Sequence, residues 1–192
     1  MKRDELVAYL DDFLQAKTIE DRSNNGLQVE GEAEVSRLAF AVDAGLAAFE
    51  GAYEAGAQML IVHHGLFWGS PLMITGVHRR RLKLLLEADL SLYASHLPLD
   101  FHDTVGNNVT LARWLDLKDV GPFGDYKGLP AGVAGRLPAA LSLDRFVALV
   151  EKSLGEPVAR VWPFGPSKVR HVGIVSGGAG FLVDQAAEAG VD

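Results

Sequence analysis

Five of the six histidines in the chain lie between positions 63 and 102, and several fall where an apolar run of strand length ends. His63 and His64 follow one such run, and His96 ends another. Two carboxylates are placed in a similar way, because Asp43 ends a third run and Asp100 comes four residues after His96. Imidazole and carboxylate groups without a thiolate suit Zn²⁺, Mn²⁺ or Fe²⁺. These residue types therefore predict a site for divalent cations.

The placement of these residues at strand ends predicts that they meet in space. In an open parallel sheet the ligand crevice lies outside the carboxyl ends of the strands. His63 and His64 would point to opposite faces of a regular strand, but a turn at the strand end lets each bind one of two neighbouring cations. Asp100 is well placed as the anionic ligand. Two cations about 3.5–4 Å apart are a common device for hydrolysis. His96 and Asp43 are predicted, by position alone, as catalytic proton relays or as groups that orient the ligands.

Each histidine also has a simpler interpretation. A single histidine at a strand end is more often a hydrogen-bonded structural residue than a metal ligand. His102 and Asp103 share a loop with Asp100 and are expected to orient ligands. His78 begins a predicted helix and is expected at the surface or as a cap, and His171 is expected at a solvated or core-edge position.

The elements that must position these residues alternate along the first 120 residues. Apolar spacing of about 3.6 residues predicts helices, and short apolar runs predict strands. The helices are expected at residues 6–14, 46–55, 77–88 and 108–115, and the strands at 37–43, 59–62 and 92–96. Strands followed by helices, with apolar residues on both strand faces, indicate an α/β fold with a largely parallel sheet.

Glycine and proline cluster between residues 121 and 132, which predicts a hinge. The metal-site domain would then comprise residues 1–120, and a second α/β lobe would comprise residues 121–192. Strands are expected there at 132–137, 158–162 and 169–175, with helices beginning at Ser142 and spanning 179–189. Residues 176–180 (Ser-Gly-Gly-Ala-Gly) lie where backbone N–H groups could hold a phosphate. Glycines that permit tight strand-to-helix packing explain the segment equally well.

The composition excludes several classes of function. The chain has 192 residues, no cysteine, and 18 basic against 25 acidic residues, for a net charge of −7. Disulfides, thiolate metal sites and cysteine nucleophiles are therefore excluded. The negative charge argues against general binding of nucleic acids or anionic membranes. Neither a secretory signal nor an apolar stretch long enough for a membrane span is evident, so a cytoplasmic location is expected.

Four segments, in order, resemble the motifs of the GTP cyclohydrolase I type 2 (Nif three-like) family. They are residues 21–29 (Asp-Arg-Ser-Asn-Asn-Gly-Leu-Gln-Val), 62–68 (Val-His-His-Gly-Leu-Phe-Trp), 93–108 (which include Ser-His-Leu-Pro-Leu-Asp and Val-Gly-Asn-Asn), and 174–180. The resemblance implies a Nif three-like fold, a dinuclear site with His63, His64 and Asp100 as ligands, and a toroidal homohexamer. The family's later His-x-x-x-Glu motif has no counterpart after Gly180, so the chain is expected to lack a C-terminal segment.

The resemblance also implies a reaction. A metal-dependent hydrolase of this kind would open the guanine ring of GTP and release formate, so the expected substrate is a small molecule such as a nucleotide. Hydrolysis of phosphoesters or amides would fit the same residues equally well. The alternative is a non-enzymatic metal-binding scaffold or interaction protein. Open coordination positions would favour the enzyme, and a closed shell of protein ligands would favour the scaffold.

Overall fold

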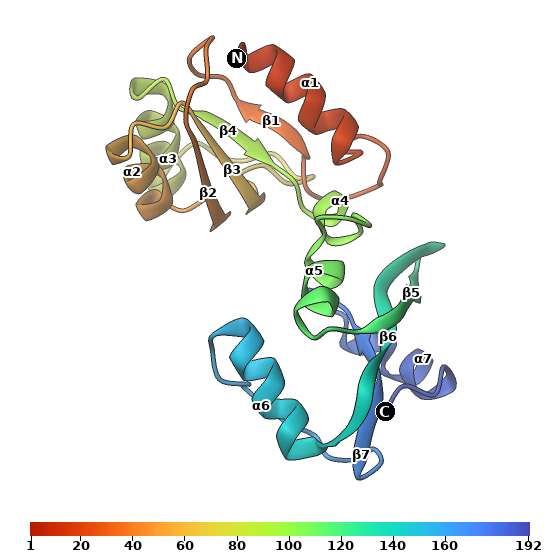
Figure 1. Ribbon diagram of the computed structural model, residues 1–192. Helices are drawn as coiled ribbons and strands as arrows, with labels where there is room; N and C mark the ends of the chain where they lie inside the picture. The colour runs from red at the N-terminus through yellow and green to blue at the C-terminus, as the bar shows by residue number, and fades with distance from the viewer. The chain divides into compact units, whose positions relative to one another are not determined.

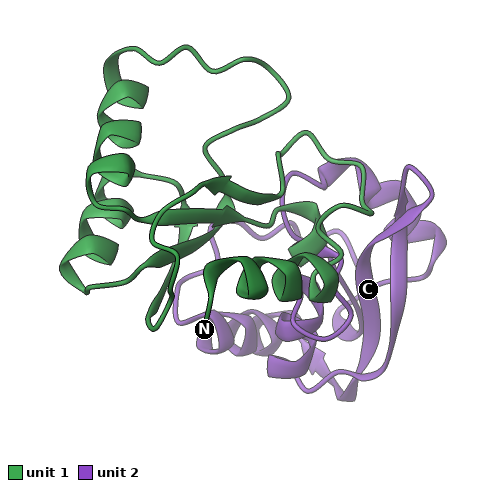
Figure 2. Cartoon of the chain, turned by 90° about the horizontal axis from the view of Figure 1, so that it is seen from above, with its two compact units in different colours: residues 1–99 green, residues 100–192 purple.

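The computed structural model describes residues 1–192, which divide into two compact units, residues 1–99 and 100–192 (Figure 2). The division between Leu99 and Asp100 comes earlier in the chain than the predicted one between residues 120 and 121. No helix is both long enough and apolar enough to cross a membrane.

The first unit contains a four-stranded sheet in the order β1-β4-β3-β2 (Figure 1). Its strands are β1 (Gly26–Val29), β2 (Leu38–Asp43), β3 (Met59–His64) and β4 (Ser91–Ala94). Strands β2, β3 and β4 are parallel, which confirms the expected α/β fold with a largely parallel sheet. Strand β1 pairs antiparallel with β4 and was not predicted, because its four residues are too few to show a pattern beside the polar turn that precedes them.

Helices cover both faces of this sheet. Helices α2 (Leu46–Glu54) and α3 (Gly76–Glu87) pack on one face, and α1 (Arg3–Phe13) packs on the other (Figure 1). Burial of the central strands on both faces explains their continuous apolar sequence. Strand β4 continues into α4 (Leu97–Asp100), a single turn that was not predicted.

The second unit is built on an antiparallel sheet in the order β5-β6-β7. Its elements are α5 (Asn107–Trp114), β5 (Lys118–Tyr126), β6 (Leu129–Ser142), α6 (Leu143–Leu154), β7 (Lys168–Ile174), the 3₁₀ helix η1 (Gly180–Leu182) and α7 (Val183–Glu188). Helices α5 and α6 supply apolar residues to the core on this sheet.

Two predictions for this unit are wrong. The expected hinge at 121–132 is part of a β-hairpin, whose two-residue turn at Lys127 and Gly128 has positive φ at both positions. Such turns match the twist of paired strands, so the glycines and prolines mark a hairpin and not a linker. Residues 158–162 form no strand, and Trp162 is 72% exposed. Their apolar composition therefore does not reflect burial.

Candidate metal centre

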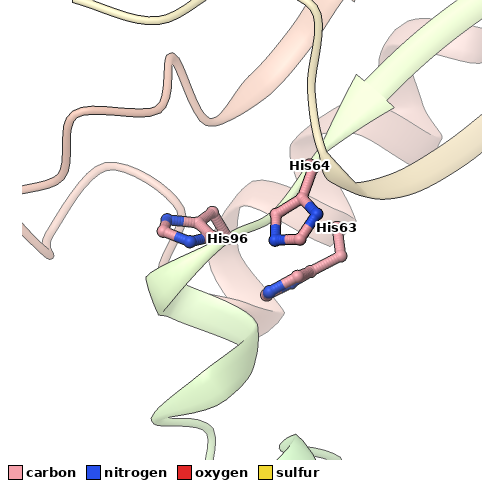
Figure 3. Close-up of side chains that lie close together, drawn as sticks. All are labelled: His63, His64 and His96. Atoms are coloured by element: carbon pink, nitrogen blue, oxygen red, sulfur yellow. The ribbon is translucent and has the colours of Figure 1, made fainter. Parts of the chain in front are cut away.

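Three imidazoles converge where β3 and β4 end (Figure 3). His63 and His64 are the last residues of β3, and His96 follows the end of β4. The strands are parallel neighbours, so their carboxyl ends lie at one edge of the sheet. One ring nitrogen of each histidine lies within 4.8 Å of the other two. The rings of the adjacent His63 and His64 are 4.6 Å apart, so the alternation of side chains along a strand does not separate them here.

Each imidazole is oriented through its Nδ1 atom. The Nδ1 of His63 lies 3.0 Å from the carbonyl oxygen of Ser95, and that of His64 lies 2.7 Å from Oδ1 of Asp43. The Nδ1 of His96 lies 3.0 Å from a carboxylate oxygen of Asp21. Because carbonyl and carboxylate oxygens accept hydrogen bonds, each Nδ1 acts as the donor. In the neutral ring the lone pair then belongs to Nε2, so Nε2 is the atom of each ring that can bind a cation.

Asp21 was not among the residues predicted for the site. Its side chain is only 3% exposed, and it also accepts hydrogen bonds from the backbone N–H groups of Ser23 and Leu97 and from Nδ2 of Asn25. Burial raises the pKa of the Asp21 carboxyl, but the hydrogen bonds from Asn25, Ser23, His96 and Leu97 outweigh burial and hold the pKa below its ordinary value. Asp21 therefore faces His96 as an anion at neutral pH.

Asp43 reaches the site through His64. Its side chain is 74% exposed, in contrast to the buried Asp21, and its hydrogen bond to His64 joins the ends of the neighbouring strands β2 and β3. Trp68 also borders the cluster. Its ring lies edge-on to that of His96, with 5.0 Å between the ring centroids.

Asp100 belongs to the second unit, where its buried carboxylate is held by two side chains. Its Oδ1 accepts hydrogen bonds of 2.7 Å from Asn107 Nδ2 and from the hydroxyl of Ser176. Asn108 joins the same network, because its Oδ1 accepts a hydrogen bond from the backbone N–H of Ser176. That N–H is therefore already used within the protein, which counts against a phosphate site at residues 176–180. The role of Asp100 as a metal ligand stays a prediction.

Two of the other histidines, His102 and His171, have local hydrogen-bond partners. Nδ1 of His102 accepts hydrogen bonds from the backbone N–H groups of Thr104 and Val105, and the side chain of Asp103 is 94% exposed. His78 lies in α3, and His171 lies in β7 with its Nδ1 donating to the carbonyl oxygen of Gly190.

Comparison with known proteins relates the whole chain to one family. A family model described as Duf34/NIF3 (NGG1p interacting factor 3) matches residues 1–192. A Deinococcus radiodurans protein named "GTP cyclohydrolase 1 type 2 homolog" is 45% identical over 190 residues, which cover 99% of this chain and 72% of that protein. An Archaeoglobus fulgidus protein of the same name is 46% identical over 188 residues, which cover 98% of this chain and 74% of that protein.

Solved structures show the same relationship. A structure titled "protein ybgI, unknown function" superposes with a TM-score of 0.92 at 37% identity, covering 100% of this chain and 76% of that one. The crystal structure of TTHA1606 from Thermus thermophilus has a TM-score of 0.86 at 42% identity, covering 96% of this chain and 74% of that one. The chain therefore spans about three quarters of the length of these relatives.

Proposed function

The chain belongs to the Duf34/NIF3 family, and from this membership we propose that it is a metal-dependent hydrolase whose cations bind at His63, His64 and His96. The observation that carries the proposal is the convergence of three ring nitrogens within 4.8 Å. Imidazole donors suit Zn²⁺, Mn²⁺ and Fe²⁺. A site with fewer than four protein ligands on each cation would leave coordination positions for water or substrate, whereas structural zinc sites are closed by four ligands.

The proposed centre is dinuclear, and we assign Asp100 to it as the anionic ligand in addition to the histidines. The cations would supply Lewis-acid activation of water and of the attacked group. We include His96 among the metal ligands because one of its ring nitrogens lies within 4.8 Å of those of His63 and His64. Asp43 is exposed and bonded to His64, so it is the group that we assign to proton exchange with solvent.

We propose a small-molecule substrate, with GTP as the first candidate because curated relatives are named GTP cyclohydrolase 1 type 2 homologs. The reaction would hydrolyse the imidazole ring of guanine and release formate. The second unit has a pocket of about 300 Å³, a volume at the lower end of the size range of small-molecule sites. Its lining includes Asp100, Asn108 and Val133.

The proposal is tested on chelator-dialysed protein to which Zn²⁺ or Mn²⁺ is returned. Formate release from GTP and cleavage of a generic phosphodiester are measured side by side, which separates the two hydrolytic reactions. Turnover should require added metal and should be lost in His63→Ala and His64→Ala. Metal-dependent turnover that survives in both variants would contradict the proposed site.

We also propose that the chain forms a homo-oligomer, with a hexamer as the expected state. Light scattering during size exclusion should then give six times the protomer mass of 20.6 kDa. A monomer would contradict the proposed assembly.

A further inference from the structure

We infer that residues 21–28, here called the clamp segment, position the imidazole cluster for cation binding, and that Asp21 fixes His96 as the Nδ1–H tautomer, in which Nε2 can bind a cation. The inference rests on the proposed metal site, and it assigns positioning roles to Asp21, Asn25 and Gln28. The clamp segment is far from the histidines in sequence, yet it contacts the chain just beyond both histidine-bearing strands.

The clamp segment holds both the ring and the backbone of His96. The carboxylate of Asp21 accepts from Nδ1 of His96 at 3.0 Å and from the backbone N–H of Leu97 at 3.0 Å. Oδ1 of Asn25 accepts from the backbone N–H of His96 at 2.8 Å. The side chain of Asn25 also donates to Asp21, so the two clamp residues fix one another. With its backbone and Nδ1 held, the His96 ring has little freedom to turn.

Gln28 holds the chain that follows His63 and His64. Its Oε1 accepts from the backbone N–H groups of Leu66 and Phe67 at 2.7 and 3.2 Å. Its Nε2 donates to the carbonyl oxygens of Phe67 and Asn24 at 3.2 and 2.7 Å. Both the oxygen and the nitrogen of the Gln28 amide therefore make hydrogen bonds, which connect the chain just after β3 to the clamp segment.

Burial distinguishes Asp21 from Asp43, the other carboxylate that binds a histidine. The Asp43 side chain is 74% exposed, so water can replace it beside His64. The Asp21 side chain is 3% exposed, so its removal leaves Nδ1 of His96 without an acceptor. A carboxylate partner fixes the tautomer of a ligating histidine and raises its basicity, and loss of such a partner typically weakens metal binding about 10- to 100-fold. Asp21 should therefore contribute more to cation affinity than Asp43.

The experiment is a titration of the metal-free full chain with Co²⁺, followed by visible absorption and calorimetry. Asp21→Ala should weaken Co²⁺ binding about 10- to 100-fold. Asp21→Asn should weaken it less, because an amide oxygen still accepts from Nδ1 of His96 although the charge is lost. Gln28→Leu should also weaken binding. Asp12→Ala, which removes an exposed carboxylate from α1, is the control and should bind Co²⁺ like the wild type.

A second measurement separates positioning from general stability. Nitrogen-15 NMR of the metal-free protein should show the Nδ1–H tautomer for His96 in the wild type and a shift toward Nε2–H in Asp21→Ala. Gln28→Leu should leave the His96 tautomer unchanged. If Asp21→Ala does not fold, Asp21→Asn carries the affinity test and should show a several-fold loss.

The outcomes distinguish this inference from the proposed function. Wild-type Co²⁺ affinity in the Asp21 variants, together with weakened binding in His63→Ala and His64→Ala, would overturn the role of Asp21 and leave the metal site standing. An unchanged His96 tautomer in Asp21→Ala would also overturn that role. Wild-type affinity in His63→Ala and His64→Ala would overturn the metal site and the inference together.

Discussion

The hydroxyl of Ser176 donates a hydrogen bond of 2.7 Å to Oδ1 of Asp100, although the two residues are 76 positions apart in the sequence. Asn107 donates to the same oxygen, also at 2.7 Å. Two side-chain donors on one oxygen restrict the rotation of the buried carboxylate. The glycine-rich segment that begins at Ser176 thus helps to hold the side chain of Asp100 in place.

Removal of this hydroxyl should cost stability. Ser176→Ala removes one donor from the carboxylate of Asp100, and a hydrogen bond to a charged group contributes about 1.5–3 kcal/mol. Urea unfolding should show a loss toward the lower end of that range, and Ser176→Thr should recover part of it. Ser142→Ala is the matched control, because Ser142 is exposed and makes no side-chain cap to α6. Equal losses in the two alanine variants would contradict the assignment.

Tyr93 offers a test of the hydrophobic core between α1 and the sheet of the first unit. Its side chain is fully buried, and its hydroxyl donates to Oδ1 of Asp11 at 3.0 Å. Burial, together with the negative charge of Asp11, raises the pKa of Tyr93, so the hydroxyl stays protonated and remains a donor.

Tyr93→Phe should lower the free energy of unfolding by about 1.5–3 kcal/mol, because its hydroxyl bonds a charged carboxylate. The loss should lie toward the lower end, since Asp11 keeps its ion pair with Lys17. Urea unfolding measures this change. Tyr53→Phe, at a position that is 61% exposed, should be close to neutral. No loss in Tyr93→Phe would show that the hydrogen bond contributes nothing net.

The lowered pKa of Asp21 predicts how stability depends on pH. A carboxyl whose pKa is lower in the folded protein than in the unfolded chain stabilises the fold above the unfolded value of about 3.9. That contribution is lost as the pH falls through the folded pKa. In metal-free protein, the wild type should therefore exceed Asp21→Asn in unfolding free energy at pH 7, and the gap should narrow below about pH 4. Urea unfolding at several pH values measures the gap, and a constant gap would contradict the cause given for the pKa shift.

The sequence predicted the elements that have strong local patterns. The apolar runs before His63 and His96 are strands, and the rule for parallel sheets correctly indicated that their ends meet. Asp21 escaped prediction because its partners are 75 and 76 residues away, and nothing in a polar loop shows what its side chains will bind. The bond between Ser176 and Asp100 was hidden for the same reason.

Two predictions failed because they were made from composition, which does not show which segments pair as strands. The glycines and prolines at 121–132 suggested a linker but belong to a hairpin, and the positive φ of its two-residue turn favours a glycine, here Gly128, as much as a hinge does. The apolar residues at 158–162 suggested a strand, yet no strand pairs with them.

Gly65 follows His63 and His64 directly, and its backbone lies close to Gln28 and Ala94. A substitution at Gly65 tests whether this close approach is required. A Cβ atom at this position would lie 2.4 Å from Nε2 of Gln28 and 2.6 Å from Cβ of Ala94. Neither atom can move without disturbing β4 or the hydrogen bonds of Gln28, so Gly65→Ala should cost about 1–3 kcal/mol of stability. It should also weaken Co²⁺ binding, because the exit of β3 moves with the two histidines.

The matched control for this variant is Gly51→Ala in α2, where an added Cβ meets no atom within 4 Å. Alanine inside a helix is favoured over glycine by about 0.5–1 kcal/mol, so Gly51→Ala should stabilise the fold and leave Co²⁺ affinity unchanged. Urea unfolding and the Co²⁺ titration measure both variants. Wild-type stability and affinity in Gly65→Ala would show that the close passage beside Gln28 is not required for the geometry of the cluster.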